Sequence, residues 1–337
     1  MNRFEPSCVN GQALRGDMDA ALWASASELC NFEGSVDISP SASPMRASPL
    51  DYGAYSDLAL NIPRGKSLSD ESQAEAAAHL HGRLATQSGT PLPGSTDHLK
   101  IFNFSSEDYS PFQVQRLARW FDTEENKSLG LAPVDQAGLT RVRDYIGRAL
   151  QVMEKADPEL FGEIIAIVDE IMLASADPSH SLDFTAGSSF ALWGGIVVNC
   201  EKIDDWTEIY NTLVHEQGHS LLFAIARDEP LVLNPNVASF TSPVRDDLRP
   251  MDGIYHTAFV TAREARALDR LLAWQKQSGE LSAEDLRLIE DSLEISVITF
   301  WQSLEAMGTI ASLSDLGQSI MDECRDYMTR NFALVYE

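Results

Sequence analysis

Near the middle of the chain, residues 206–226 read WTEIYNTLVHEQGHSLLFAIA. Apolar residues occupy most sides of this segment when it is drawn as a helix, which predicts one buried helix. His215, Glu216 and His219 interrupt the apolar run and form an HExxH motif. Residues four apart share a helix face, so the two imidazoles can hold one metal ion. A helix that carries two histidines by coincidence fits less well, because buried ionisable groups need partners.

The segment just before this helix changes character. Residues 188–199 read SSFALWGGIVVN, which is β-branched and aromatic with Gly194 and Gly195 in the middle. This pattern predicts a small strand or hairpin that precedes the metal-binding helix. An exposed strand at this place would pair with an extended peptide through main-chain hydrogen bonds. An ordinary hairpin of the core explains the pattern equally well.

Apolar residues recur at helical spacing through most of the remaining sequence. Asp204 or Asp205 can cap the HExxH helix, and residues 282–285 (SAED) form a plausible capping box. Gly218 inside the HExxH helix indicates a close approach of another backbone or of the substrate. The fold class is therefore mainly α (α+β), with further helices expected at 112–121, 136–156, 159–175, 253–278, 283–307 and 314–331.

The first hundred residues have a different composition. Residues 34–70 and 87–97 are rich in Ser, Pro, Ala and Gly, which favours turns and extended chain, with a short helix expected at 71–86. We therefore predict a Ser/Pro/Ala-rich N-terminal segment at 1–98 and a helical, metal-dependent catalytic domain at 99–337. Part of the segment should dock on that domain, because it carries several apolar residues: Leu50, Tyr52, Tyr55, Leu58, Leu60 and Ile62.

The charge balance limits the classes of partner. The chain has 337 residues, with 25 basic against 51 acidic side chains and a formal net charge of −26. Such a surface repels nucleic acid and anionic membranes and favours a basic peptide or protein, although acidity also serves solubility. The four cysteines are widely spaced, which is typical of reduced thiols. With no signal peptide or transmembrane segment recognised, a soluble cytoplasmic protein is expected.

Two histidines hold a divalent ion poorly, so a third protein ligand is expected. His256 lies 37 residues after His219, at the start of an apolar helix, and is the favoured candidate. Glu264 competes with it, because one class of zinc peptidases takes a glutamate on a later helix as its third ligand. The remaining histidines fit ordinary surface positions better than ligands: His79, His81, His98 and His180.

The segment between these ligands, residues 241–250, reads TSPVRDDLRP. Arg245 or Arg249 can bind a carboxylate through both arms of its guanidinium group. A carboxylate-bearing cosubstrate that chelates the metal would need such a partner. The alternative is a surface loop whose arginines and aspartates pair with one another.

The order of HExxH, an S-P-x-R-x-D-x-R-P loop and a G-x-x-H helix start resembles the HExxH-type peptide β-hydroxylases. These enzymes depend on iron(II) and 2-oxoglutarate and modify ribosomally made peptides in natural product biosynthesis. The matching text is residues 215–219, 242–250 and 253–256, and the resemblance covers about 196–272. Val244 departs from the pattern, which has a tryptophan there. The first hundred residues show no resemblance.

The resemblance implies an oxidoreductase, a dioxygenase that hydroxylates a side chain of a peptide, either free or within a precursor that carries a leader. Iron(II) would be held by His215, His219 and His256. The far carboxylate of 2-oxoglutarate would bind Arg249 or Arg245. Glu216 would be a catalytic residue, as a carboxylate that tunes or supplements the metal ligands.

Two other classes of function remain open at this stage. A zinc metallopeptidase would use the same His215 and His219, with Glu216 as the general base for a zinc-bound water. The arginine loop favours the oxygenase, because a peptidase needs no carboxylate clamp of this kind. A non-catalytic binding protein with a vestigial metal site is the third class, and the intact Glu216 argues against it.

Overall fold

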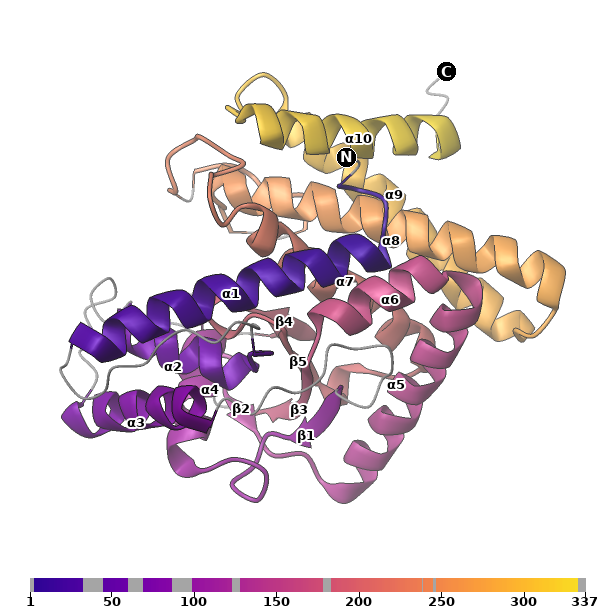
Figure 1. Cartoon of the computed structure of the whole chain (residues 1–337). Helices are drawn as coiled ribbons and strands as arrows, with labels where there is room; N and C mark the ends of the chain where they lie inside the picture. Colours follow the sequence, from indigo (N-terminus) through magenta and orange to yellow (C-terminus); the bar gives the residue numbers. More distant parts are fainter. Residues whose placement is uncertain are drawn as a thin grey trace. The chain divides into compact units, whose positions relative to one another are not determined.

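A computed structural model describes residues 3–32, 45–59, 69–86, 99–122, 128–177, 183–237, 239–244 and 247–332. These residues form ten α-helices and five strands, which confirms the mainly α prediction (Figure 1). None of the described helices is both long enough and apolar enough to cross a lipid bilayer. The helices are α1 (Cys8–Phe32), α2 (Pro49–Ala59), α3 (Asp70–Thr86), α4 (Pro111–Phe121), α5 (Gln136–Ala156), α6 (Pro158–Ile167), α7 (Trp206–Ile225), α8 (Met251–Ser278), α9 (Ala283–Met307) and α10 (Asp315–Phe332). The strands are β1 (Lys100–Asn103), β2 (Leu131–Ala132), β3 (Glu170–Ala176), β4 (Ala186–Ser188) and β5 (Gly195–Asn199).

The chain folds into two compact units, each assembled from separate stretches of sequence. The helical unit comprises Met1–Cys8, Tyr145–Ile164 and Asp205–Glu337, and the sheet unit comprises Val9–Asp144 and Ile165–Asp204. The predicted division at residue 99 runs differently, because α2 and α3 belong to the same unit as the strands.

The sheet unit is built on the strand order β1-β3-β5-β4, with β2 paired to β3. Strands β1, β3 and β5 are parallel, whereas β4 is antiparallel to β5, so the hairpin expected before the HExxH helix is present. All five residues of β5 are buried, and the strand lies between β3 and β4. Strand β5 is therefore no open edge, and the suggested peptide track does not apply to it.

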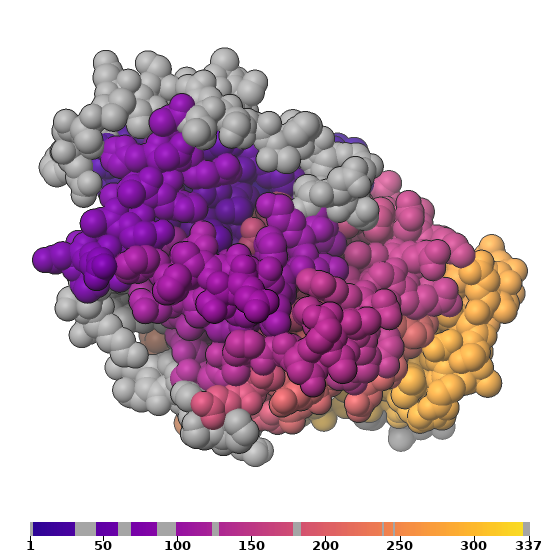
Figure 2. Space-filling view, turned by 90° about the horizontal axis from the view of Figure 1, so that it is seen from below, coloured from indigo at the N-terminus to yellow at the C-terminus, as the bar shows by residue number. Residues whose placement is uncertain are grey.

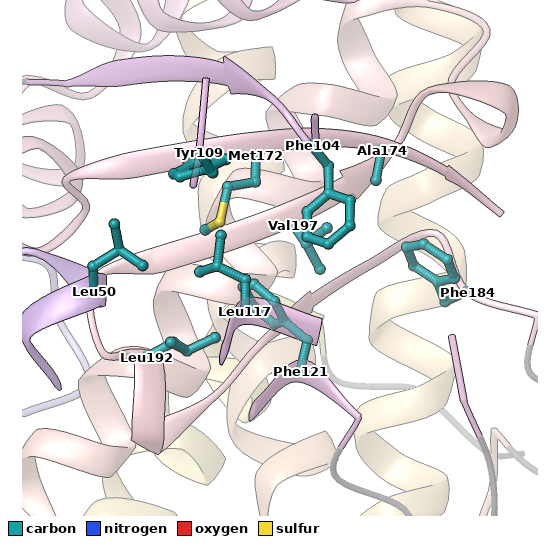
Figure 3. Close-up of a cluster of buried hydrophobic side chains, with 10 residues drawn as sticks. All are labelled: Leu50, Phe104, Tyr109, Leu117, Phe121, Met172, Ala174, Phe184, Leu192 and Val197. Atoms are coloured by element: carbon teal, nitrogen blue, oxygen red, sulfur yellow. The ribbon is translucent and has the colours of Figure 1, made fainter. Parts of the chain in front are cut away.

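One face of this sheet carries a cluster of buried apolar side chains (Figure 3). Leu50 of α2 and Leu117 of α4 pack there against Met172 of β3 and Val197 of β5. Helix α2 thus docks as its apolar residues predict, with Leu50 and Tyr52 buried, while Leu60 and Ile62 lie outside the described residues. In Figure 2, purple atoms of the N-terminal stretches adjoin magenta atoms of the stretches that follow.

Buried ion pairs also attach the N-terminal stretches to the sheet. Arg15 of α1 and Arg46 both pair with Asp169, which directly precedes β3. Arg15 also lies over the ring of Trp193, 5.0 Å from its centroid. The Ser- and Pro-rich composition concealed this anchoring, because it depends on partners more than a hundred residues away.

The helical unit contains the HExxH segment as α7, which ends one residue earlier than predicted. The side chain of Asp205 caps its start by accepting hydrogen bonds from the backbone N–H groups of Thr207 and Glu208, as one of the two predicted caps. Helix α8 runs antiparallel to α7. A Cβ atom at Gly218 would lie 3.1 Å from Val260 Cγ1 of α8, so the close approach predicted at this glycine is the approach of a neighbouring helix.

Helices α8 and α9 lie side by side, joined by a short connection (orange and gold in Figure 1). Gly279 ends α8 in the left-handed conformation at φ 65°, and Ser282 and Asp285 form the predicted capping box of α9. Both features let the chain reverse within a few residues. The bounds of α8, α9 and α10 agree with their predicted ranges to within two residues.

The helix predicted at 159–175 is wrong in its second half. Helix α6 ends at Ile167, and residues 170–176 form β3, the central parallel strand. A parallel strand buried on both faces is apolar at successive positions, so its apolar residues also satisfy a helical pattern. Residues 170–174 are all buried, as expected for a strand covered on both faces of the sheet.

Candidate metal centre

Helices α7 and α8 bring the predicted ligands together. His215 and His219 lie one turn apart on α7, and the antiparallel α8 places His256 beside His219 and Glu264 beside His215. The structure therefore assembles all three predicted histidines within one side-chain cluster. It also brings in Glu264, the competing candidate.

The His215 and His219 rings face each other through the same kind of nitrogen. Their Nε2 atoms are 3.1 Å apart. Two nitrogens each about 2.1 Å from one ion and separated in this way would subtend roughly 95° at the ion. The HExxH pair thus has a spacing suited to two adjacent ligands of a single ion.

His256 approaches His219 from the other side. The Nδ1 atoms of these residues are 3.0 Å apart, and their rings stack at 5.2 Å between centroids. His219 therefore turns one nitrogen toward each neighbour, and its Cε1 lies between them. Among the described residues, no three His, Cys, Asp or Glu side chains surround one point as a metal would require.

Glu264 contacts the Nδ1 atom of His215. Its Oε1 is 2.6 Å from His215 Nδ1, and its Oε2 accepts a hydrogen bond of 2.8 Å from Ser296 Oγ of α9. With both oxygens engaged, Glu264 would orient His215 instead of binding an ion itself. A histidine that donates Nδ1–H to a carboxylate presents the lone pair of Nε2 to a metal. This is the nitrogen that His215 turns toward His219.

The cluster has uneven protonation. Burial acts to lower the pKa of His215, but the hydrogen bond and charge of Glu264, with the charge of Glu216, raise that pKa to about 9. Burial, followed by the charges of His215 and His256, lowers the pKa of His219 well below its usual value. Burial lowers the pKa of His256, as does the charge of His215, against the opposing charge of Asp252. Neutral imidazoles at His219 and His256 are the form that binds a metal.

Glu216 lies next to His215 on α7 and is buried, at 6% exposure. Its charge contributes to the raised pKa of His215, so its carboxylate is electrically close to the cluster. The ring of Phe223, one turn after His219, lies 6.4 Å from the His219 ring and 5.4 Å from the His256 ring. An aromatic side chain therefore borders the two histidines that the pKa shifts keep neutral.

Arg249 immediately precedes Pro250, the N-cap of α8. Its backbone pairs with Phe240, and its Nη2 atom lies 3.3 Å from an oxygen of Asp247. The side chain is about one-fifth exposed, at 21%. The other clamp candidate, Arg245, lies outside the described residues, as do His98 and His180.

The sequence analysis did not identify several residues that contact the cluster or lie near it. Ser296 carries no motif, and only its contact with Glu264 gives it a role. Gln217, a variable position of the motif, is fully buried and accepts a hydrogen bond from Arg263. His79, judged a surface residue, is half-buried and lies 2.7 Å from Asp51 in the sheet unit.

A scan against models of protein families matches none of them, and a search of curated proteins finds no match to this chain.

Proposed function

We propose that this protein is an iron(II)- and 2-oxoglutarate-dependent hydroxylase that acts on a side chain of a peptide. The observation that carries the metal centre is the contact between Glu264 and His215 Nδ1, which leaves His215 Nε2 facing His219 Nε2. A buried carboxylate behind one of two converging imidazoles is the usual arrangement around a protein-bound transition metal.

The donor set fits such an ion. Imidazole nitrogen is a good ligand for iron, zinc, copper and nickel, and His256 lies against the same pair of rings. Three imidazoles packed together in the interior are costly as a purely structural cluster, because burial disfavours their charged forms and the charge of His215 disfavours protonation of its neighbours. A metal ion held by these nitrogens would offset that cost.

The choice of iron(II) with 2-oxoglutarate rests on the three-part sequence pattern and on Arg249. When bound, iron(II) and 2-oxoglutarate would supply the oxidising chemistry. One oxygen atom of dioxygen enters a C–H bond of the peptide to give C–OH, and the other enters 2-oxoglutarate, which becomes succinate and carbon dioxide. Arg249 lies two residues before α8, and the helix rises about 8 Å from Met251 to His256. An arginine side chain spans a comparable length, so its guanidinium can bind the far carboxylate of a cosubstrate held at the histidines.

The remaining residues position and shield the reaction. Glu264 and Ser296 fix the ring of His215, and Phe223 covers His219 and His256 on one side. Glu216 supplies a buried negative charge that offsets the charge of a divalent ion. The formal net charge of −26 favours a neutral or basic peptide as the substrate.

A zinc metallopeptidase is the second candidate, and the buried Glu216 beside His215 is the observation in its favour. In that case Glu216 would take a proton from a metal-bound water. In the peptidase Arg249 would serve only local contacts such as its ion pair with Asp247, whereas the hydroxylase gives it a role toward the cosubstrate.

The proposal is tested by adding 2-oxoglutarate to the iron(II)-loaded protein without oxygen. A 2-oxo acid that chelates iron(II) gives a visible absorption band, which we expect to saturate with 2-oxoglutarate. Arg249→Ala should weaken this binding by about 10- to 100-fold, because a bidentate charged contact is lost. Arg227→Ala, which removes an arginine that pairs with Asp228, is the matched control.

Admitting oxygen should then release succinate and, with a suitable peptide, a product heavier by one oxygen atom. If no absorption band forms and peptides are cleaved with zinc alone, the hydroxylase is wrong and the metallopeptidase takes its place. If the band forms equally well in Arg249→Ala, the assignment of the clamp is wrong.

A further inference from the structure

The first described residues of the chain form a fixed strap, although they precede α1 and have no regular structure. The backbone N–H groups of Arg3 and Phe4 donate to Glu323 of α10, at 2.7 and 3.0 Å. The N–H of Ser7 donates to Glu163 of α6 at 3.0 Å. Backbone N–H groups of three of these residues are thus held by carboxylates of α6 and α10.

Side chains complete the attachment of this strap, residues 3–8. Phe4 is buried at 1% exposure, and its ring packs against Tyr327 of α10 at 5.3 Å. Glu5 pairs with Arg266 of α8. The strap thus contacts α6, α8 and α10, all within the helical unit.

Hydrogen bonds connect the strap to α7, the helix that carries the HExxH motif. The carbonyl of Phe4 accepts a hydrogen bond of 2.8 Å from Arg263, which also donates to Glu163 and, at 3.1 Å, to Gln217 Oε1. Gln217 Nε2 in turn donates to Glu163 at 3.0 Å. A buried knot of Glu163, Arg263 and Gln217 therefore joins the strap to α7 and α8.

The knot and the metal centre occupy neighbouring positions on the same two helices. Gln217 lies midway between His215 and His219 in sequence and points to the opposite side of α7. Arg263 directly precedes Glu264, which orients His215. Because a helix moves as a rigid rod over two turns, a shift of the knot displaces the imidazoles on the other face.

Stability alone gives a weak reason for such a knot. A buried ion pair is often no better for stability than packed apolar side chains, and its best-attested value is in fixing one arrangement of the chain. Arg263 Nε is buried with no hydrogen-bond partner among the described residues, which is unfavourable for stability. The knot is better explained as a device that sets the position of α7 against α8.

We infer that residues 3–8 are a positioning element of the metal centre, acting through Glu163, Arg263 and Gln217. This inference rests on the proposed metal site but on neither iron nor hydroxylation. It predicts that loosening the strap at a point remote from the histidines lowers metal affinity.

The test uses Glu323→Ala in the full chain, which removes the acceptor of Arg3 and Phe4 and replaces no member of the knot and no histidine. Asp322→Ala, an exposed neighbour on the same helix that contacts Gln318 and Arg325, is the matched control. The probes are zinc(II) and cobalt(II) affinity by competition with a chelator, and the unfolding midpoint of the metal-free protein.

We expect Glu323→Ala to weaken metal binding roughly tenfold, the lower end of the effect of changes behind the ligands, and Asp322→Ala to leave it unchanged. Equal metal affinity in Glu323→Ala and wild type would overturn the inference, as would equal losses in both variants. A purely structural strap would lower the unfolding midpoint alone. Failure of the wild-type chain to bind either metal would instead refute the metal centre, and with it the proposed function.

Discussion

The sharpest test of the metal centre is the replacement Glu264→Gln. Glutamine keeps the length of the side chain, so its Oε1 can still accept the Nδ1–H of His215 and its amide can contact Ser296. What is lost is the negative charge 2.6 Å from His215 Nδ1. That charge makes the imidazole a stronger ligand and fixes its tautomer.

Replacing a carboxylate behind a ligating histidine typically costs 10- to 100-fold in metal affinity, or about 1.4–2.7 kcal/mol. Because geometry is retained in Glu264→Gln, we expect a loss near tenfold, with Glu264→Ala near a hundredfold. Ser296→Ala removes only the neutral hydrogen bond to Glu264 and should cost less than either. Zinc(II) affinity, measured by chelator competition near neutral pH, reports all three.

His256→Ala provides the comparison that can refute the reasoning. If His256 is the third ligand, its removal weakens zinc binding more than Glu264→Gln does. If Glu264 is itself the third ligand, His256→Ala leaves the affinity intact and both Glu264 variants reduce it severely. Unchanged affinity in Glu264→Gln would show that the carboxylate does not act on the metal through His215.

Two further predictions concern packing and pH. Gly218→Val should destabilise the protein by about 1–3 kcal/mol and weaken metal binding, because even a Cβ atom would lie 3.1 Å from Val260 Cγ1. Denaturant unfolding measures the loss of stability, and metal titration measures the loss of affinity. An unaffected metal affinity would contradict the close contact of α7 and α8. Burial, followed by the charge of Asp169, raises the pKa of Glu170 to about 7. The folded protein therefore binds this proton more tightly than the unfolded chain. The contribution of this proton to the free energy of unfolding is fully present below about pH 4.5. It is lost as pH rises through 7, which lowers the free energy of unfolding by about 3 kcal/mol. Urea unfolding of Glu170→Gln at pH 5 and pH 8 should show a pH dependence smaller than that of the wild type by about 2.5 kcal/mol, because part of the change occurs below pH 5; an identical dependence in the variant and wild type would contradict the assignment.

Local sequence patterns were sufficient to predict most helices of the helical unit. The 3.6-residue period predicted α7, α8, α9 and α10, because each helix buries one stripe of its own side chains. The capping roles of Asp205 and Ser282 also followed from sequence, since a cap and the backbone N–H groups that donate to it lie within three residues. The same period placed His215 and His219 on one face of α7.

Where two local patterns coincide, the sequence could not choose between them. Residues 159–175 satisfy a helical stripe, yet their second half is the buried strand β3, because pairing with β1 and β5 supplies its hydrogen bonds. The Ser- and Pro-rich composition of residues 34–70 favoured turns and extended chain, but Arg46, like Arg15, pairs with Asp169 more than a hundred residues away.

The sequence by itself determined that two imidazoles share a helix face and that an arginine-rich loop leads to a third histidine. Only the tertiary structure decided what surrounds them. Glu264 lies 49 residues from His215, and Ser296 a further 32 residues along, so no local spacing relates these side chains. The antiparallel packing of α8 on α7, at Gly218 and Val260, brings them together. Side chains on one helix are related by its period, whereas side chains on different helices meet only where packing sets the register.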